Sequence, residues 1–325
     1  MSDDTTTTDQ VMRPALGAQP EATKSRASKT ISIVGWTALT LACLIFFSIM
    51  KLPESKLKAL IQGTLSSTLS AQGIQFTSAE SDLSISPLGI RYFMKGVSLK
   101  KPPEERGLVL ETVKVSPSIL SMIAGKLGAS FAVSQGDGSL TGSFSGKNSD
   151  VFLSFNASGL NLGKMGVLPF LAGIQGTLNL EGSGSVSGDF ADPKSLNGSI
   201  KLNLSKIVFD AQSIQGFAIP KLSISEGTLE FEINQGKVSL TTVKIGKPGS
   251  ADDLIASASG DIQLARVMDS SVLNIKTKFS LSQNITKAFV LIDAILGPAK
   301  QAGGGYAYTI NGALGAPNAI PGIAP

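Results

Sequence analysis

The sequence predicts a mainly β protein, in which a single N-terminal transmembrane helix precedes an extended, curled antiparallel sheet with a few short capping helices. Three observations lead to this fold class. Residues 31–50 form an uncharged apolar run. Residues 52–325 contain many short segments in which apolar and polar residues alternate, the pattern of half-buried strands. Clusters of Gly, Asn, Asp and Ser separate these segments, as turn residues separate the strands of an all-β sheet.

The apolar run at residues 31–50 is long enough to cross a bilayer, since a helix of roughly 20 apolar residues spans the hydrocarbon core. A cleaved signal peptide is the alternative, but its apolar region usually has ~7–15 residues and precedes a small-residue cleavage site. This run is longer and ends in Met50-Lys51-Leu52-Pro53, so an uncleaved anchor fits better. The predicted membrane span, residues 30–51, includes Ile31, Trp36, Cys43 and Met50.

Residues 1–29 form a polar tail without a periodic apolar set, which predicts a disordered segment. The number of basic residues on each side of the span is only a weak indication of its orientation in the membrane. Four precede it, Arg13, Lys24, Arg26 and Lys29, and three follow it, Lys51, Lys56 and Lys58. A short basic tail is rarely translocated, whereas a large domain crosses regardless of its charge. We therefore expect a single-pass membrane protein with its N-terminus on the cytoplasmic side and its large C-terminal domain on the other side.

An amphipathic helix is predicted over residues 53–71, at the start of a β-rich domain over residues 52–325. Pro53 suits its first turn and Gly73 its C-terminal end. Its apolar residues recur at helical spacing: Leu57, Leu60, Ile61, Leu65 and Leu69. We expect this helix to cap the domain, and an interfacial helix flanked by Lys56 and Lys58 is the alternative.

Short strands make up most of the chain from residue 74 onward. The clearest alternations are Val151-Leu153-Phe155, Ile200-Leu202-Leu204, Leu229-Phe231-Ile233, Val238-Leu240, Ile262-Leu264 and Leu273-Ile275. Two helical interruptions are predicted, at residues 116–125 and at residues 285–296, the second ended by Gly297-Pro298. The segment at residues 160–174 predicts either a loop or a broken helix lying on the sheet.

Composition restricts the chemistry of the chain. It contains no histidine, which excludes histidine-based acid–base catalysis and histidine metal ligands. Cys43, the only cysteine, falls inside the predicted span. Glu230 and Glu232 share one face of a predicted strand, and Asp252-Asp253 reads as a hairpin loop, so neither pair predicts a metal or catalytic site. The net charge of +4 is not concentrated in a basic cluster with aromatic residues. We therefore expect no cofactor, no metal, no nucleic-acid partner and no enzymatic activity.

Several sequence segments resemble those of a known protein family. Residues 182–200 read GSGSVSGDFADPKSLNGSI, and a related strand–Gly–turn phrase returns at residues 303–318. Together with residues 214–245 and the Leu296-Gly297-Pro298 step, they resemble the periplasmic core of type II secretion system protein N. The strand phrases are also similar to those of AsmA/TamB-type envelope proteins. The first resemblance implies a bitopic component of the secretion machine in the bacterial inner membrane, with a cytoplasmic N-terminus and a periplasmic C-terminal domain. The second implies a curled sheet whose apolar groove is associated with lipid transport.

A sheet with one apolar face must bury it by closing, by stacking or by binding something apolar. The predicted lipid- or partner-facing set is Leu202, Leu204, Leu229, Phe231, Ile233, Val238, Leu240, Ile262, Leu264 and Ile275, for which ordinary sheet core is the alternative. The leading hypothesis is a non-catalytic structural role among other type II secretion subunits. The alternative hypothesis is a lipid-binding or lipid-transfer module that takes phospholipid from the inner membrane.

Overall fold

The chain divides into two units, Met1–Lys51 and Leu52–Pro325. The computed structural model describes residues 54–86, 89–102, 107–118, 121, 123–214, 217–288 and 292–322, all within the second unit. The predicted tail and the predicted membrane span fall outside these residues. None of the helices in the described ranges is long and apolar enough to cross a membrane.

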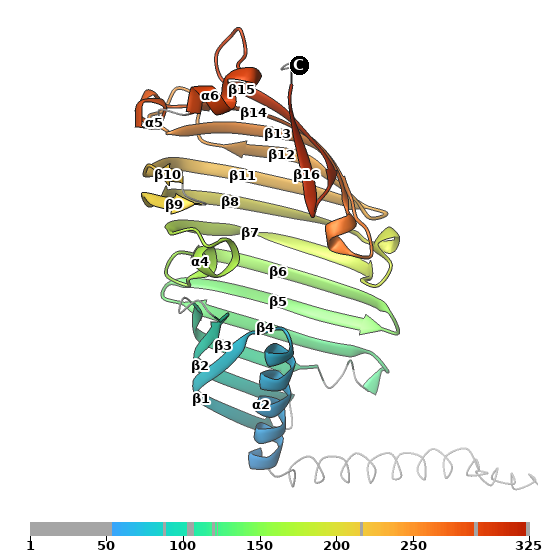
Figure 1. The fold of residues 1–325 in the computed structure, drawn as a ribbon. Helices are drawn as coiled ribbons and strands as arrows, with labels where there is room; N and C mark the ends of the chain where they lie inside the picture. The colour runs from blue at the N-terminus through green and yellow to red at the C-terminus, as the bar shows by residue number, and fades with distance from the viewer. Residues whose placement is uncertain are drawn as a thin grey trace, which may run out of the picture. The chain divides into compact units, whose positions relative to one another are not determined.

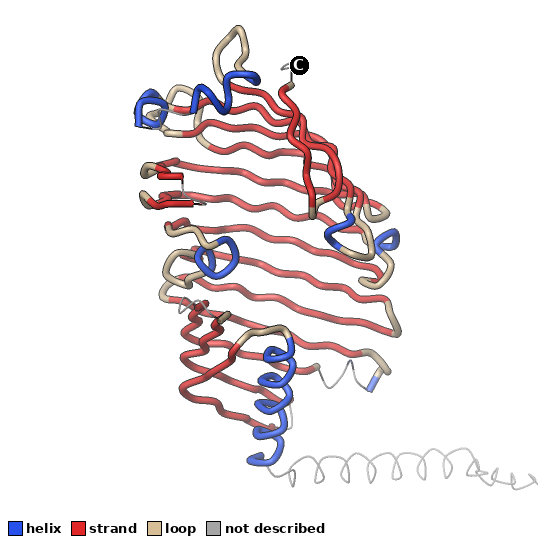
Figure 2. The backbone as a smooth tube through the Cα atoms, viewed as in Figure 1, coloured by secondary structure: helices blue, strands red, loops and turns tan. Residues whose placement is uncertain are grey.

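Fourteen strands form one antiparallel sheet, and each strand pairs with its neighbours along the chain (Figures 1 and 2). The prediction of a mainly β, antiparallel fold is therefore confirmed. The strands are β1 (Gln75–Ser86), β2 (Gly89–Lys100), β3 (Gly107–Pro117), β4 (Leu127–Gln135), β5 (Gly138–Lys147), β6 (Asp150–Asn161), β7 (Gly176–Asp189), β8 (Asn197–Phe209), β11 (Leu222–Asn234), β12 (Lys237–Ile245), β13 (Leu254–Gln263), β14 (Val272–Leu281), β15 (Tyr306–Ala313) and β16 (Ala316–Pro321). The one interruption is a small hairpin between β8 and β11, made of β9 (Gln212–Ile214) and β10 (Phe217–Ile219).

Tight turns hold this succession of hairpins in register. Gly136, with φ 55°, joins β4 to β5, and Gln235 and Gly236, with φ 49° and 73°, join β11 to β12. Left-handed residues at such positions match the twist of the flanking strands. These turns lie where the Gly, Asn and Asp clusters of the sequence predict them.

Side chains of successive strand residues point to opposite faces of the sheet. The cross-strand register then places apolar residues mainly on one face and polar residues mainly on the other. One row of directly opposed residues crosses all fourteen strands, one residue per strand, and contains only apolar residues and glycines. From β1 to β16 it reads Leu83, Tyr92, Val115, Phe131, Gly142, Phe155, Gly184, Ile200, Phe231, Leu240, Gly260, Ile275, Ile310 and Ala319. We call the face that carries this row the apolar face and the opposite one the polar face.

Helix α2 (Glu54–Ala71) lies against β1 and supplies the main core at this end of the sheet (Figure 1). Its Leu57, Ile61 and Leu65 pack on a buried cluster of the apolar face. That cluster consists of Leu83, Tyr92, Met94 and Val97. Gly73 follows the C-terminal end of the helix; its φ of 73° is left-handed, and its N–H donates to the Ser70 carbonyl. Helix α2 thus occupies the segment in which the apolar spacing predicts an amphipathic helix.

Helix α4 (Val167–Ala172) covers a second part of the apolar face, next to β3 and β7 (Figure 1). Met165 and Val167 pack around Leu160 and Ala157 of β6. Leu168 reaches a neighbouring cluster built from Leu178, Ile207 and Ile224. The predicted loop or broken helix at residues 160–174 is therefore the end of β6 followed by a short helix on the sheet.

Glycines of the apolar face give space to large neighbours. A Cβ on Gly142 would overlap the ring of Phe131, and one on Gly184 would lie 2.6 Å from the Phe155 ring. Each ring therefore lies over a glycine of the adjacent strand, which keeps the face filled although every second row position in this region lacks a side chain. A stretch rich in Gly and Ser thus still builds an apolar surface.

The two predicted helical interruptions are present in part among the described residues. In residues 116–125, Ser116 and Pro117 complete β3, only residues 121 and 123 of the described chain are helical, and Ile123 is exposed. In residues 285–296 the described chain forms two short helices, α5 (Gln283–Ala288) and α6 (Ile292–Leu296). Gly297-Pro298 then opens a 3-10 turn, η3 (Gly297–Ala299), because proline suits the first turn of a helix as well as the residues after one.

Candidate functional site

The apolar face brings together nine of the ten residues that the sequence predicts as a lipid- or partner-facing set. Their strands, β8 and β11 to β14, are consecutive neighbours in the sheet. The nine are Leu202, Leu204, Leu229, Phe231, Ile233, Val238, Leu240, Ile262 and Ile275. The tenth, Leu264, follows the end of β13, where its N–H donates to the Gly236 carbonyl. Leu264 therefore lies in the loop that follows β13, because this strand ends at Gln263.

None of these nine side chains is fully buried, although all lie on the apolar face. Helix α2 contacts β1, and α4 contacts β3 and β7, whereas the nine residues belong to β8 and to strands beyond it. Near them, Leu168 of α4 packs at the cluster that includes Leu204. Each of the nine side chains is partly exposed, so this stretch of the apolar face is accessible.

The apolar face extends beyond the predicted set in both directions. Phe131, Phe155 and Val186 continue it across β4, β6 and β7. At the other end, the ring of Phe279 lies 5.4 Å from that of Tyr306 and 6.2 Å from that of Tyr308, measured between centroids. At a strand spacing of about 4.8 Å, thirteen steps from β1 to β16 extend over roughly 60 Å. Apolar–polar alternation in β4 and β5 could have revealed part of this extension, but glycines interrupt it.

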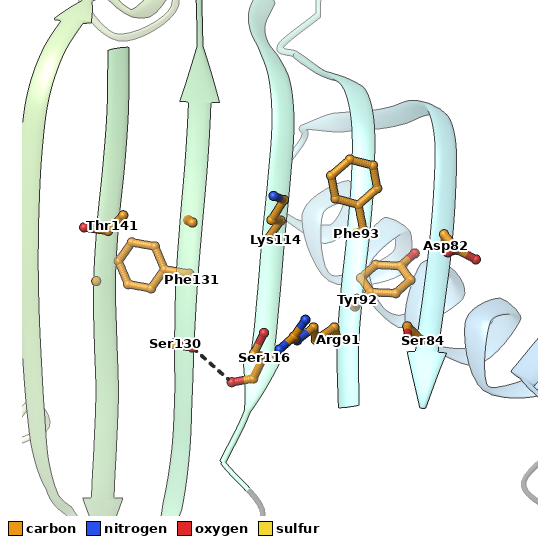
Figure 3. A pocket seen from close by; sticks show the side chains of 12 residues that line it. Asp82, Ser84, Arg91, Tyr92, Phe93, Lys114, Ser116, Ser130, Phe131 and Thr141 are labelled. Atoms are coloured by element: carbon orange, nitrogen blue, oxygen red, sulfur yellow. Dashed lines mark hydrogen bonds between the residues drawn. The ribbon is translucent and has the colours of Figure 1, made fainter. Parts of the chain in front are cut away.

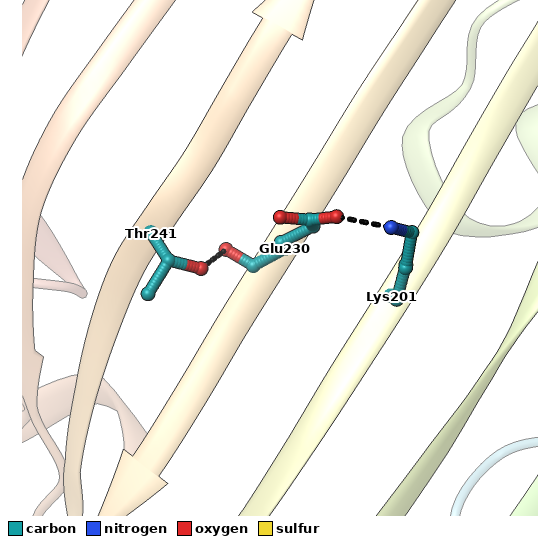
Figure 4. A network of polar contacts seen from close by, with 3 residues as sticks. All are labelled: Lys201, Glu230 and Thr241. Carbon is teal, nitrogen blue, oxygen red and sulfur yellow. Dashed lines mark hydrogen bonds and ion pairs between the residues drawn. The ribbon is translucent and has the colours of Figure 1, made fainter.

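The polar face carries the ion pairs of the sheet. Lys201 Nζ lies 2.6 Å from Glu230 Oε1, and the Thr241 hydroxyl donates to the Glu230 carbonyl at 2.9 Å (Figure 4). The hydrogen bond from Lys201, followed by one from Thr242, holds the pKa of Glu230 below its ordinary value. Lys237 and Asp261 form a second pair at 3.5 Å. Glu230 is thus engaged in a cross-strand ion pair, and Glu232 lies on the same face.

Two regions of the polar face are hollowed. The first has a volume of about 540 Å³ and includes Arg91, Phe93 and Lys114 in its wall (Figure 3). Lys114 and Lys95 place their ammonium groups 5.6 and 5.7 Å from the centroid of the Phe93 ring, a cation–π arrangement. The second region lies on β12 to β14 and is walled by lysines. Both were missed from the sequence because their residues are far apart along the chain.

The Asp252-Asp253 segment is a loop between β12 and β13 that is tied to β11. Asp252 accepts hydrogen bonds from the Lys247 N–H at 2.7 Å and from the Ser225 N–H and hydroxyl at 2.8 and 2.7 Å. Partial burial raises the pKa of Asp252, but these hydrogen bonds outweigh it, so the pKa lies below its ordinary value of 3.8. Within the described ranges, no group of three His, Cys, Asp or Glu side chains could hold a metal ion.

The Asp252 hydrogen bonds make stability depend on pH. We expect Asp252→Asn to lower the free energy of unfolding by about 1 kcal/mol near neutral pH. Because the folded-state pKa is depressed, the carboxylate stabilises the fold above the unfolded-state pKa and stops doing so as the pH falls through the folded-state pKa, below 3.8. Urea unfolding of both chains near neutral pH and in acid checks this, and a difference that stays constant with pH would contradict it.

Fold and site together define a class: a β-meander protein whose single large sheet presents one continuous apolar face and one charged face. Comparison with protein-family models, with curated proteins and with solved structures found no match to this chain.

Proposed function

We propose that this protein handles lipid in the bacterial envelope, with the apolar face holding the acyl chains of phospholipid. The observation that supports this most directly is the unbroken row of apolar residues and glycines across all fourteen strands. Beyond β7 the described helices leave much of that row half-exposed. Exposed apolar surface of this extent marks a binding site in a soluble domain.

The chemistry of the face suits an acyl chain better than a peptide. From β8 to β13 the opposed residues of the apolar face carry no charged side chain, and the backbone groups of these inner strands are paired with neighbouring strands. An acyl chain needs no hydrogen bonds, whereas a bound peptide must satisfy its own backbone groups. A surface of this kind therefore accepts a hydrocarbon chain without leaving a polar group unpaired.

Energetics favour exchange over permanent binding. Moving a methylene group from water to an apolar surface contributes about 0.8 kcal/mol, but a lipid that comes from a bilayer leaves an equally apolar environment. The net free-energy change is then small in either direction, which suits a surface that takes up and releases lipid. A membrane anchor at residues 31–50, as the sequence predicts, would tether the domain to a source of lipid.

A second candidate is the structural role in the type II secretion machine that the sequence resemblance implies. The observation that favours it is the outer edge of β1, a strand of 12 residues at one end of the sheet. An open edge of this length can pair with a strand of another protein by backbone hydrogen bonds. The opposite end is less suitable, because β16 contains Pro317 and Pro321.

Photo-crosslinking at alternating positions of β11 tests the lipid proposal in the full-length chain in bacterial cells. A photoreactive amino acid at Phe231 faces the apolar side, and the same amino acid at Glu232 faces the polar side. Phe155 and Asn156 form an equivalent pair on β6. We expect phospholipid adducts, detected by mass spectrometry, at Phe231 and Phe155 and at neither control position, since alternate side chains reach opposite faces.

The outcomes separate the two candidates. Lipid adducts restricted to the apolar positions support the proposal. Adducts with a protein at those positions would instead identify the apolar face as a protein-binding surface. The absence of any adduct at Phe231 and Phe155, with efficient crosslinking elsewhere in the chain, would contradict the lipid proposal.

A further inference from the structure

The polar face contains a hollow on β12, β13 and β14 whose wall is basic. It consists of two adjoining cavities of about 590 and 300 Å³, which share Lys244, Ser257 and Lys278. Lys276 lines the smaller cavity, and a loop of Gly303, Gly304 and Gly305 lines the larger one. A cavity of this size is in the range that holds a small molecule or a lipid headgroup.

The cross-strand register places three lysines beside strand β13. Ser257 of β13 lies opposite Lys244 of β12 on one side and opposite Lys278 of β14 on the other. Ser259, two residues along the same face, lies opposite Lys276. The backbones of β12 and β14 are two strand spacings apart, or about 10 Å, a distance that two flexible lysine side chains can bridge towards a common ligand.

Carboxylates balance this positive charge only in part. Neither cavity has an aspartate or glutamate in its wall. Within the part of the chain that the structure describes, Lys244, Lys276 and Lys278 form no ion pair, in contrast to Lys201 and Lys237. Glu230 of the adjacent strand β11 forms its ion pair with Lys201 and also interacts electrostatically with Lys244, which leaves Lys276 and Lys278 without such a carboxylate in the wall of the hollow. Three like charges so close together repel one another unless an anion binds among them.

We propose that this hollow binds a phosphoryl group. A phosphate monoester carries about −1.5 to −2 charges and three strong acceptor oxygens, which three ammonium groups and the neighbouring serine hydroxyls can match. The glycine loop leaves room for the remainder of the ligand. A nucleic acid fits less well, because it requires a longer basic stripe, and the adjoining part of the polar face carries Glu230 and Asp261.

The site is independent of the acyl-chain surface, since the two lie on opposite faces of the sheet. The phosphoryl group could belong to a soluble phosphate compound or to an anionic lipid headgroup. The failure of either proposal leaves the other unaffected, and the two sources of phosphate can be distinguished by experiment.

The test uses the full-length chain in micelles of an uncharged detergent. In one arm, isothermal titration calorimetry measures binding of inorganic phosphate, with chloride at equal ionic strength as the reference. In the other arm, native mass spectrometry compares short-chain phosphatidic acid with phosphatidylcholine of the same chain length. A variant with Lys244→Gln, Lys276→Gln and Lys278→Gln removes the site. The matched control carries the same charge change at exposed lysines elsewhere, as Lys126→Gln, Lys147→Gln and Lys164→Gln.

We expect the site variant to bind at least about tenfold more weakly and the control to bind as the natural chain does, because charge-assisted hydrogen bonds are lost only in the first. Binding of inorganic phosphate identifies a soluble ligand, and a preference for phosphatidic acid alone identifies a headgroup. The proposal is overturned if the natural chain binds neither phosphate nor phosphatidic acid in preference to its reference, or if the control variant loses as much affinity as the site variant.

Discussion

Replacing Leu160 by alanine is expected to lower the free energy of unfolding by about 3 kcal/mol. Leu160 is 2% exposed and lies where β6 meets the segment leading into α4. It packs with Ala157 and Met165, and Leu140 and Leu180 surround this cluster. Truncation to alanine removes buried apolar surface and leaves a cavity that the paired strands on both sides of β6 cannot close.

Leu171→Ala is the matched control, because the same chemical change occurs on α4 at a side chain that is 76% exposed. We expect the control to change the free energy of unfolding by less than about 0.5 kcal/mol. Urea unfolding followed by circular dichroism measures both variants. Equal effects at the two positions would mean that the segment after β6 does not pack on the sheet as described.

The second large effect is expected at Phe231, in the accessible part of the apolar face. Phe231→Glu should reduce the phospholipid that co-purifies with the full-length chain by about tenfold or more. A carboxylate that an acyl chain covers loses hydration without gaining a partner, and this costs more than the 1.4 kcal/mol that corresponds to a factor of ten. Native mass spectrometry of the protein released from detergent micelles quantifies the bound lipid.

Asn156→Glu adds the same charge to the polar face, at an exposed position of β6 away from the lysine hollow, and serves as the control. We expect it to leave the bound lipid unchanged, and circular dichroism verifies that both variants are folded. Retention of lipid by the Phe231→Glu chain, or equal loss in the control, would show that the lipid does not lie on the apolar face.

Alternation of apolar and polar residues was sufficient to predict individual strands and most of the candidate site. Phe231 could be assigned to the same face of its strand as Leu229 and Ile233, and Leu240 to the same face as Val238, because side chains alternate with a period of two. The sequence could not show that Phe231 and Leu240 lie opposite each other, or that Phe131 and Phe155 join the same surface. Glycines between the two aromatic residues conceal the pattern, and only the register reveals that the rings cover them.

The bounds of helical segments were harder to predict than the strands. In residues 116–125, Ser116 and Pro117 belong to β3, because their pairing with Ser130 and Ala129 of β4 extends the strand into the start of the segment. In residues 285–296 the periodicity holds for Ile285 and Ile292, which are buried, but Ile295 is 50% exposed. Among the described residues of this segment, helix is present in α5 and in α6.

Residue composition and alternation were enough to predict that this chain is mainly β, that its strands have one apolar side, and that histidine and cysteine chemistry have no place in residues 52–325. These properties are local, since they depend on composition and on short-range patterns. Strand pairing in the folded chain was needed to show that the apolar sides join into one row across fourteen strands and that Lys244, Lys276 and Lys278 line one hollow. Such assemblies depend on strand order and register, which arise from hydrogen bonds between segments that are far apart in the chain.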